Sequence, residues 1–199
     1  MPFVARDKTT GERVDISQYP DPRLVLVSAN MVCPVCEQDM IIKAGSIIQA
    51  HFAHKPGRDD CPYAAYSAGE SPAHRAAKLI VRDALSDWFK EYIDAKGNLE
   101  VYIPDVMHAR NRIADLLFSF PNGWRVAHEI QLAPITPAEL QERSDDYMSA
   151  GIDCFWWFGR SAATAENLLW SEKRHGYHLI IRFDEGSAGM ELGSYEAEL

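Results

Sequence analysis

The sequence lacks an excess of basic residues, a long apolar run, an internal repeat and any low-complexity segment. Its 199 residues include 20 Lys and Arg against 29 Asp and Glu, a formal net charge of −9. Phosphate-binding proteins usually show a basic surface, so this charge argues against a non-specific nucleic-acid binder. No run approaches the roughly 18 apolar residues of a membrane span, and the first residues lack a signal-peptide core. We therefore expect a cytoplasmic protein without a membrane partner.

Cysteine is also scarce, and its distribution argues against a disulfide framework. Of the four cysteines, Cys33, Cys36 and Cys61 cluster with His51 and His54, while the fourth lies far along the chain. A C-x₂-C turn followed by His and Cys is typical of a tetrahedral zinc site. We predict a structural Zn²⁺ held by Cys33, Cys36, His54 and Cys61, with His51 as the alternate ligand. The alternative is a set of reduced cysteines in a small core.

Two apolar runs separated by a Pro-Asn-Gly turn predict a β-hairpin at residues 113–120 and 124–131. The first strand carries Asp115. In the second, Glu129 and Gln131 are two residues apart and therefore face the same side. Oxygen ligands at neighbouring strand ends suit a hard divalent cation such as Mg²⁺ or Mn²⁺. Taken alone, the pattern also fits ordinary polar residues of a half-exposed hairpin.

The strongest helix signal covers residues 71–92, where apolar residues recur at helical spacing after a Ser-Pro start. Glu70, His74 and Lys78 follow one another at four-residue steps, so one helix face can present all three. Beside the hairpin, Glu70 would complete a metal shell, while His74 and Lys78 would contact phosphate. A solvated helix face with an ion pair is the simpler alternative.

The remaining elements predict a mixed α/β sheet flanked by helices. A helix that begins at Thr136 places Arg143 and Tyr147 one turn apart, either as a surface pair or as a phosphate clamp. The other predicted elements are strands at 23–28, 153–159 and 177–183, a hairpin near 40–48, and a helix at 162–174.

Several motifs occur together in a fixed order between roughly residues 30 and 160. They are Cys33-Pro-Val-Cys36, His51-Phe-Ala-His54, Cys61, Glu70 with His74 and Lys78, Ala114-Asp115, Glu129-Ile130-Gln131, and Arg143 with Tyr147. This ordered set resembles the CoiA-like competence family. Members of that family are similar to the PD-(D/E)xK nucleases and carry a Cys/His module ahead of the catalytic domain.

The resemblance implies a restriction-endonuclease-like PD-(D/E)xK core with a small β-rich, zinc-binding module at its amino-terminal side. It implies a Mg²⁺ or Mn²⁺ ion held by Asp115, Glu129 and the carbonyl of Ile130. The implied catalytic residues are Glu70, Lys78, Asp115, Glu129 and Gln131, and the implied nucleic-acid contacts are His74, Arg112, Arg143 and Tyr147.

Two positions depart from the family pattern. Gln131 replaces the expected lysine, a replacement that family members often carry, and Lys78 is the candidate substitute. On this hypothesis Lys78→Ala abolishes cleavage and leaves the fold intact. The basic residue usually next to Ala-Asp is Arg112 here, with Ile113 intervening.

The combined interpretation is a metal-dependent deoxyribonuclease in DNA uptake, processing or phage-related DNA metabolism. Expected domains are a zinc module at 1–66, a nuclease-like domain at 67–185 and an acidic tail at 186–199. A catalytically weak or inactive adaptor on the same scaffold is the competing class. A zinc-dependent hydrolase is a third, disfavoured because three thiolates and a histidine close the coordination sphere. The sequence leaves open DNA or RNA, endonuclease or exonuclease, and the oligomeric state.

Overall fold

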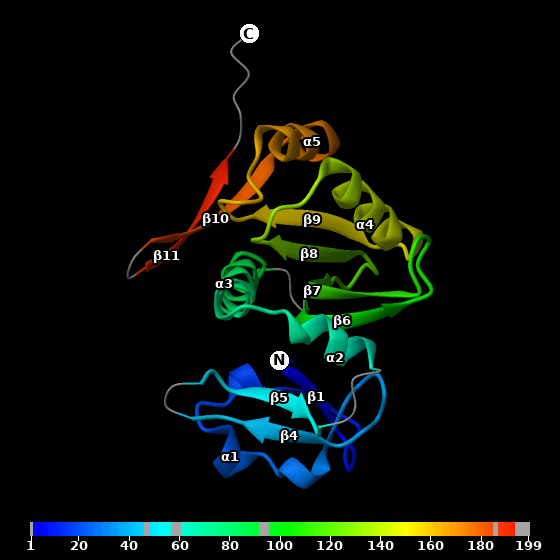
Figure 1. The fold of residues 1–199 in the computed structure, drawn as a ribbon, viewed down its shortest axis with the longest axis vertical. Helices are drawn as coiled ribbons and strands as arrows, with labels where there is room; N and C mark the ends of the chain where they lie inside the picture. Colours follow the sequence, from blue (N-terminus) through cyan, green and yellow to red (C-terminus); the bar gives the residue numbers. More distant parts are fainter. Residues whose placement is uncertain (1, 46–47, 57–60, 92–95, 185–186, 194–199) are drawn as a thin grey trace. The chain divides into compact units, whose positions relative to one another are not determined.

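The chain divides into two compact units, Met1–Ser71 and Pro72–Leu199. A computed structural model describes residues 2–45, 48–56, 61–91, 96–184 and 187–193 (Figure 1). Among these described residues, no helix has the length and apolar character needed to cross a bilayer. The domain limits given above, at residues 66 and 185, stay predictions.

The first unit is small and rich in short strands. Its strands are β1 (Val4–Asp7), β2 (Arg13–Asp15), β3 (Met31–Val32), β4 (Met40–Lys43) and β5 (His51–His54), and its helices are α1 (Pro22–Val25), α2 (Pro62–Ala68) and the 3₁₀ turns η1 (Ile16–Gln18) and η2 (Ser28–Asn30). β1 pairs with β2 and β3, and β4 forms an antiparallel hairpin with β5. Phe3, Ile16, Phe52 and Tyr63 of this unit are fully buried.

The strand predicted at residues 23–28 is wrong. Pro22 instead opens the short helix α1, because its fixed φ suits a first helical turn and removes a donor that a strand would need. Leu24, Val25 and Val27 are exposed, so their alternation does not reflect a buried face.

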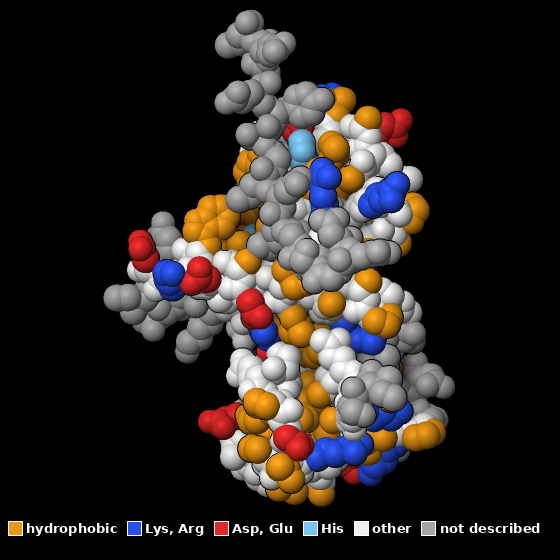
Figure 2. Space-filling view, turned by 90° about the vertical axis from the view of Figure 1, so that its left-hand side faces the viewer, with side chains coloured by type: hydrophobic (Ala, Val, Ile, Leu, Met, Phe, Trp, Pro, Cys, Tyr) orange, Lys and Arg blue, Asp and Glu red, His pale blue; other side chains and the backbone are white. Residues whose placement is uncertain are grey.

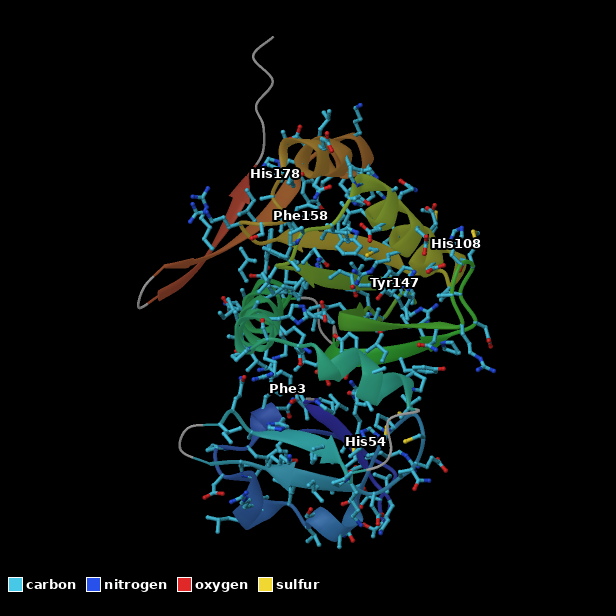
Figure 3. All side chains as sticks on the ribbon, in the orientation of Figure 1. Phe3, His54, His108, Tyr147, Phe158 and His178 are labelled. Carbon is cyan, nitrogen blue, oxygen red and sulfur yellow. The ribbon has the colours of Figure 1, made fainter. Side chains whose placement is uncertain are left out.

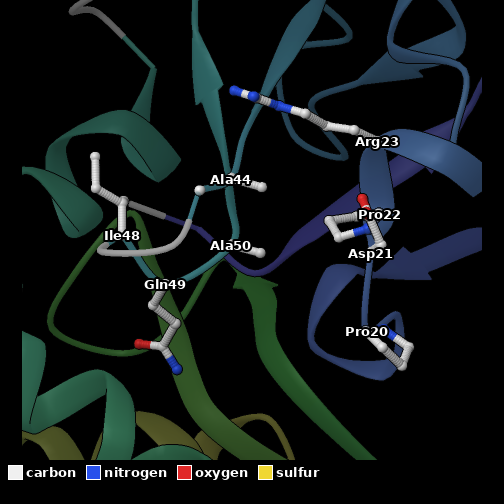
Figure 4. Close-up of a pocket in the computed structure, with 9 residues that line it drawn as sticks. Pro20, Asp21, Pro22, Arg23, Ala44, Ile48, Gln49 and Ala50 are labelled. Carbon is white, nitrogen blue, oxygen red and sulfur yellow. The ribbon is translucent and has the colours of Figure 1, made fainter.

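A pocket of about 520 Å³ lies beside α1. Figure 4 shows Asp21 and Arg23 on one side of it, and Ala44 and Gln49 on the other. None of the Cys or His residues of the predicted zinc site lines this pocket.

The second unit is built on one mixed sheet. Its elements are β6 (Lys96–Pro104), β7 (Asn111–Ser119), β8 (Arg125–Gln131), β9 (Asp153–Phe158), β10 (His178–Asp184), β11 (Ser187–Gly193), α3 (Pro72–Trp88), α4 (Pro137–Ser149) and α5 (Ala165–His175). The strand order is β11-β10-β9-β8-β7-β6, with β8 and β10 parallel to β9 and the other neighbours antiparallel (Figure 1). The predicted mixed α/β sheet flanked by helices is confirmed. β6 was not predicted from the sequence. β11 lies in the segment that was predicted to be an acidic tail, and it pairs with β10.

Helices cover both faces of this sheet. On one face Trp156 and Phe158 of β9 pack with Leu140 and Tyr147 of α4, and Figure 3 labels Tyr147 in this layer. On the other face Trp157 lines a pocket with residues of α3. The alternation of β9 side chains therefore explains why nearly every residue of that strand is apolar.

The pocket on the α3 face is aromatic. It has a volume of about 460 Å³, and Trp88, Trp124 and Trp157 are among its walls. His128 of β8 also lines it and is 5% exposed. Its Nδ1 accepts a hydrogen bond from Trp157 Nε1 at 3.3 Å, which fixes the neutral ring as the Nε2–H tautomer.

Candidate active site and metal centre

The β7–β8 ladder ends where the predicted carboxylates begin. Backbone pairing runs from Ser119–Arg125 to Leu116–His128. Beyond that point side chains bridge the strands. The Asp115 N–H donates to Glu129 Oε1 at 3.1 Å, and the Ile130 N–H donates to Asp115 Oδ2 at 2.9 Å. The two carboxylates therefore lie together between adjacent strands, as the sequence predicted for this hairpin.

His74 of α3 reaches the same place. Its Nε2 lies 3.2 Å from Asp115 Oδ2 and 2.8 Å from the carbonyl oxygen of Ile130. Both partners are acceptors, so Nε2 carries a proton. Two of the predicted metal ligands thus converge on one N–H group. Glu70 precedes α3 and belongs to the first unit, so its part in this site stays a prediction.

Glu129 is held on both oxygens by α4. Tyr147 donates its hydroxyl to Oε1 at 2.7 Å, and Arg143 forms an ion pair with Oε2. Burial raises the pKa of the Glu129 carboxyl, and the Arg143 guanidinium opposes that shift. A carboxyl with a raised pKa among other charged groups is typical of functional sites.

Arg143 and Tyr147 have different surroundings from those expected for phosphate contacts. Tyr147 is fully buried, so it positions Glu129 and has no surface to offer a ligand. Arg143 also donates to Gln131 Oε1 at 3.3 Å, and its guanidinium lies 4.6 Å from the centre of the Trp156 ring. A contact between Arg143 and nucleic acid stays a prediction.

Lys78 is fully buried and pairs with Glu100 across 2.6 Å, with both side chains inaccessible to solvent. This burial argues against the expectation that Lys78→Ala leaves the fold intact. Breaking a buried pair on one side leaves the other charge uncompensated and typically costs about 3–5 kcal/mol. The β6–β7 pairs on either side place Glu100 opposite Asp115, and Glu100 has a left-handed φ of 52°. Glu100 is thus an acidic neighbour of the site that the sequence reasoning missed.

The remaining predicted residues have structural partners. Arg112 donates to Asp146 at 2.7 Å and to Glu142 at 3.2 Å, so it ties β7 to α4. The amide of Gln131 donates to the carbonyl of Ala133 at 2.8 Å. Whether Arg112 contacts nucleic acid, and whether Gln131 orients water, are predictions that these contacts do not test.

Four ligand atoms meet in the first unit. The thiols of Cys33, Cys36 and Cys61 and a ring nitrogen of His54 all lie within 4.8 Å of one another. The sulfurs of Cys33 and Cys61 are 3.8 Å apart, close to the edge of about 3.8 Å expected for a tetrahedron with zinc–sulfur bonds of about 2.3 Å. His51 lies outside the group and is buried, with Nδ1 at 2.8 Å from a backbone carbonyl.

Each of these ligands comes from a turn or an element end. Cys33 follows β3, His54 ends β5, where Figure 3 labels it, and Cys61 precedes α2. Burial raises the pKa of the Cys33 and Cys36 thiols, whereas a cation among them stabilises thiolates. The donor set therefore fits a soft or borderline ion such as zinc.

Comparison with protein families supplies the remaining observation. A family model described as the nuclease-like domain of competence protein CoiA matches residues 70–185, and a second, for the CoiA N-terminal domain, matches residues 24–64. The chain belongs to the CoiA-like competence family. The first CoiA match spans more than half of the chain and includes α3, the β7–β8 hairpin and α4. No curated protein sequence matches the chain significantly.

The match to a CoiA nuclease-like domain agrees with the mixed α/β fold of the second unit. The resemblance pointed to Asp115 and Glu129, but not to the Lys78–Glu100 pair beside them. The available signal was the run Leu99 to Ile103, where one acidic residue interrupts an otherwise apolar and aromatic sequence. An acidic residue inside a predicted strand would have marked Glu100 as a site candidate.

Proposed function

We propose that this CoiA-like chain is a divalent-metal-dependent nuclease that hydrolyses phosphodiester bonds of DNA in DNA uptake, processing or phage-related DNA metabolism. The observation that supports this most directly is the convergence of Asp115 Oδ2 and the Ile130 carbonyl on the Nε2 proton of His74. Oxygens that accept from one N–H group can also share a cation at that position. A Mg²⁺ or Mn²⁺ ion there would supply a Lewis acid and an activated water.

The surrounding residues fit distinct roles in this reaction. Tyr147 and the Asp115 N–H orient Glu129 as the second carboxylate. Arg143 must release or share one Glu129 oxygen before that oxygen can bind an ion. Once His74 no longer donates to the two oxygens, its N–H group can donate to a phosphate. Gln131 can orient a water or a phosphate but cannot act as a base, since an amide has no useful proton to exchange.

The Cys/His group is proposed to hold a structural Zn²⁺. Three thiols and an imidazole would close a tetrahedral sphere and leave no position for a reacting water. A unit of this size buries little apolar surface, so metal binding would supply much of its folding free energy.

A nucleic-acid-binding or adaptor protein without cleavage activity is the second candidate. It is favoured by the ion pair between Arg143 and Glu129, because the guanidinium already compensates the charge that a metal would bind. Replacement of the expected lysine by Gln131 points in the same direction.

Cleavage and Mn²⁺ binding, measured on the same variants, separate the two candidates. Asp115→Asn and Glu129→Gln keep side-chain acceptors for the strand bridges while weakening metal ligation. Both should reduce Mn²⁺-dependent nicking of labelled single-stranded and duplex DNA by roughly 100-fold or more, and both should weaken the Mn²⁺ binding seen by calorimetry. Asp145→Asn on α4 is the matched control. Wild-type nicking by either variant contradicts the nuclease assignment, and a wild-type chain that binds DNA but not Mn²⁺ supports the adaptor.

A further inference from the structure

A cavity of about 740 Å³ lies at the carboxyl-terminal end of the parallel strands β8 and β9. Leu132, the residue that follows β8, forms one wall, and Gly159, Arg160 and Ser161, which follow β9, form another. Arg182 of β10 lines it as well. The carboxyl ends of parallel strands are where open α/β sheets usually bind ligands. None of the residues assigned above to the carboxylate site lines this cavity.

Hydrogen bonds at the ends of β8 and β9 connect the wall of the cavity to the carboxylate site. Gly159 N–H donates to the carbonyl of Gln131 at 2.9 Å, so the exit of β9 is bonded to the end of β8. The side chain of Gln131 accepts from Arg143, which holds Glu129. Gln131 therefore links the carboxylate site to the exit of β9 that borders the cavity.

Gly159 permits this close approach of the two strand exits. A Cβ at that position would lie 2.7 Å from Leu132 Cδ2 and 3.2 Å from Leu132 Cα. The first contact could be relieved by side-chain movement, but the second involves the backbone. The close approach of the two strand exits therefore requires glycine at position 159.

The charge around the cavity differs from that of the whole chain. Two exposed arginines, Arg160 and Arg182, belong to its lining, and the described residues that line it include no Asp or Glu. The chain as a whole has a formal charge of −9. On the face of the second unit seen in Figure 2, basic side chains stand apart from one another instead of forming a continuous field. A polyanion must therefore be held by local groups, because the overall charge repels it.

We propose that this cavity binds a backbone phosphate of the nucleic-acid strand that occupies the carboxylate site, a proposal that rests on the proposed function. Arg160 and Arg182 contact the phosphate oxygens from two different segments, the β9–α5 loop and β10. Guanidinium groups match phosphate geometry and stay charged at any working pH. The cavity positions the strand and does not take part in bond cleavage.

Salt-dependent binding tests this assignment apart from catalysis. Fluorescence anisotropy with a labelled single-stranded DNA, a duplex of the same sequence and the matching RNA is measured without added divalent ion. Arg160→Gln and Arg182→Gln should each weaken binding and lower the slope of log affinity against log salt by about 0.7 on a single strand. Lys173→Gln removes the same charge from an exposed position of α5 outside the cavity and should leave the slope unchanged.

The outcomes decide between specific and general effects. A reduced slope for both arginine variants, with Lys173→Gln unchanged, supports the phosphate subsite, and the three probes then show which backbone it prefers. Equal losses for all three variants, no loss for Arg160→Gln, or no binding of any probe by the wild-type chain overturn it. Tryptophan fluorescence verifies that each variant is folded. If the wild-type chain cleaves none of the probes with Mn²⁺ while both arginine variants still lower the salt slope, the nuclease is rejected and the phosphate subsite is kept.

Discussion

His128 should make the second unit sensitive to mild acid. Burial lowers the pKa of this histidine to about 3, from an ordinary value of 6.5. Its Nε2–H is buried with no hydrogen-bond partner among the described residues, and a second proton would enter at Nδ1, where it would face the Trp157 N–H group instead of an acceptor. Because the folded pKa is depressed, the stabilisation is complete above pH 6.5 and is lost progressively as the pH falls toward 3.

The size of the effect follows from the shift. At about 1.4 kcal/mol per pKa unit, the full range corresponds to roughly 5 kcal/mol, and the step from about pH 7 to about pH 5 to roughly 2 kcal/mol. His128→Asn keeps an acceptor near Nδ1 for Trp157 and removes the titration. The variant is expected to be less stable at neutral pH because it loses packing, but its stability should change by about 2 kcal/mol less between the two pH values.

Urea unfolding followed by tryptophan fluorescence is the suitable assay, since all five tryptophans lie in the second unit and acid effects on the first are not seen. Val126→Ala, in the same pocket and on the same strand, is the matched control. It creates a small cavity without a titrating group and should lower stability equally at both pH values. An unchanged pH dependence in His128→Asn would refute the reasoning.

Three further outcomes follow from the described contacts. Cys36→Ser should reduce the zinc content of the purified protein, measured by elemental analysis, from about one ion per chain to a small fraction. Unchanged zinc content would reject the assigned ligand set. Gly97→Ala places a Cβ 2.6 Å from Phe118 Cζ and should cost about 1–3 kcal/mol in urea unfolding; an unchanged midpoint would show that the ring moves freely. Tyr147→Phe removes the hydroxyl that donates to Glu129 and should cost about 2 kcal/mol by the same assay, whereas neutrality would mean that the carboxyl is satisfied without it.

Local signals account for the elements that were predicted correctly. α4 begins at the proline after Thr136, and the structure shows a full capping box between Thr136 and Glu139. The apolar pattern of α3 and of β7 to β9 reflects burial on one or both faces, which is visible in sequence spacing. By contrast, residues 23–28 alternate without a partner strand, and β6 contains polar residues that weaken its pattern.

The site was predictable only in part, because some of its contacts join elements that are far apart in the sequence. Strand register places Asp115 opposite Glu129, and a two-residue spacing is enough to align Glu129 with Gln131. Which basic side chain pairs with which carboxylate depends on how α3 and α4 pack on the sheet. Sequence spacing cannot predict that Lys78 pairs with Glu100, because one residue lies in α3 and the other in β6.

The left-handed residue in β6 also bears on solubility. β6 is the last strand of its sheet, and an outer strand with a regular backbone offers unpaired amide and carbonyl groups to a second molecule. At Glu100 the backbone turns to a φ of 52°, which interrupts the regular spacing of those groups midway along the strand. The Glu100 side chain is already buried against Lys78, so the irregularity at the edge lies in the backbone. We expect this interruption of the edge backbone to hinder pairing with a strand of a second molecule.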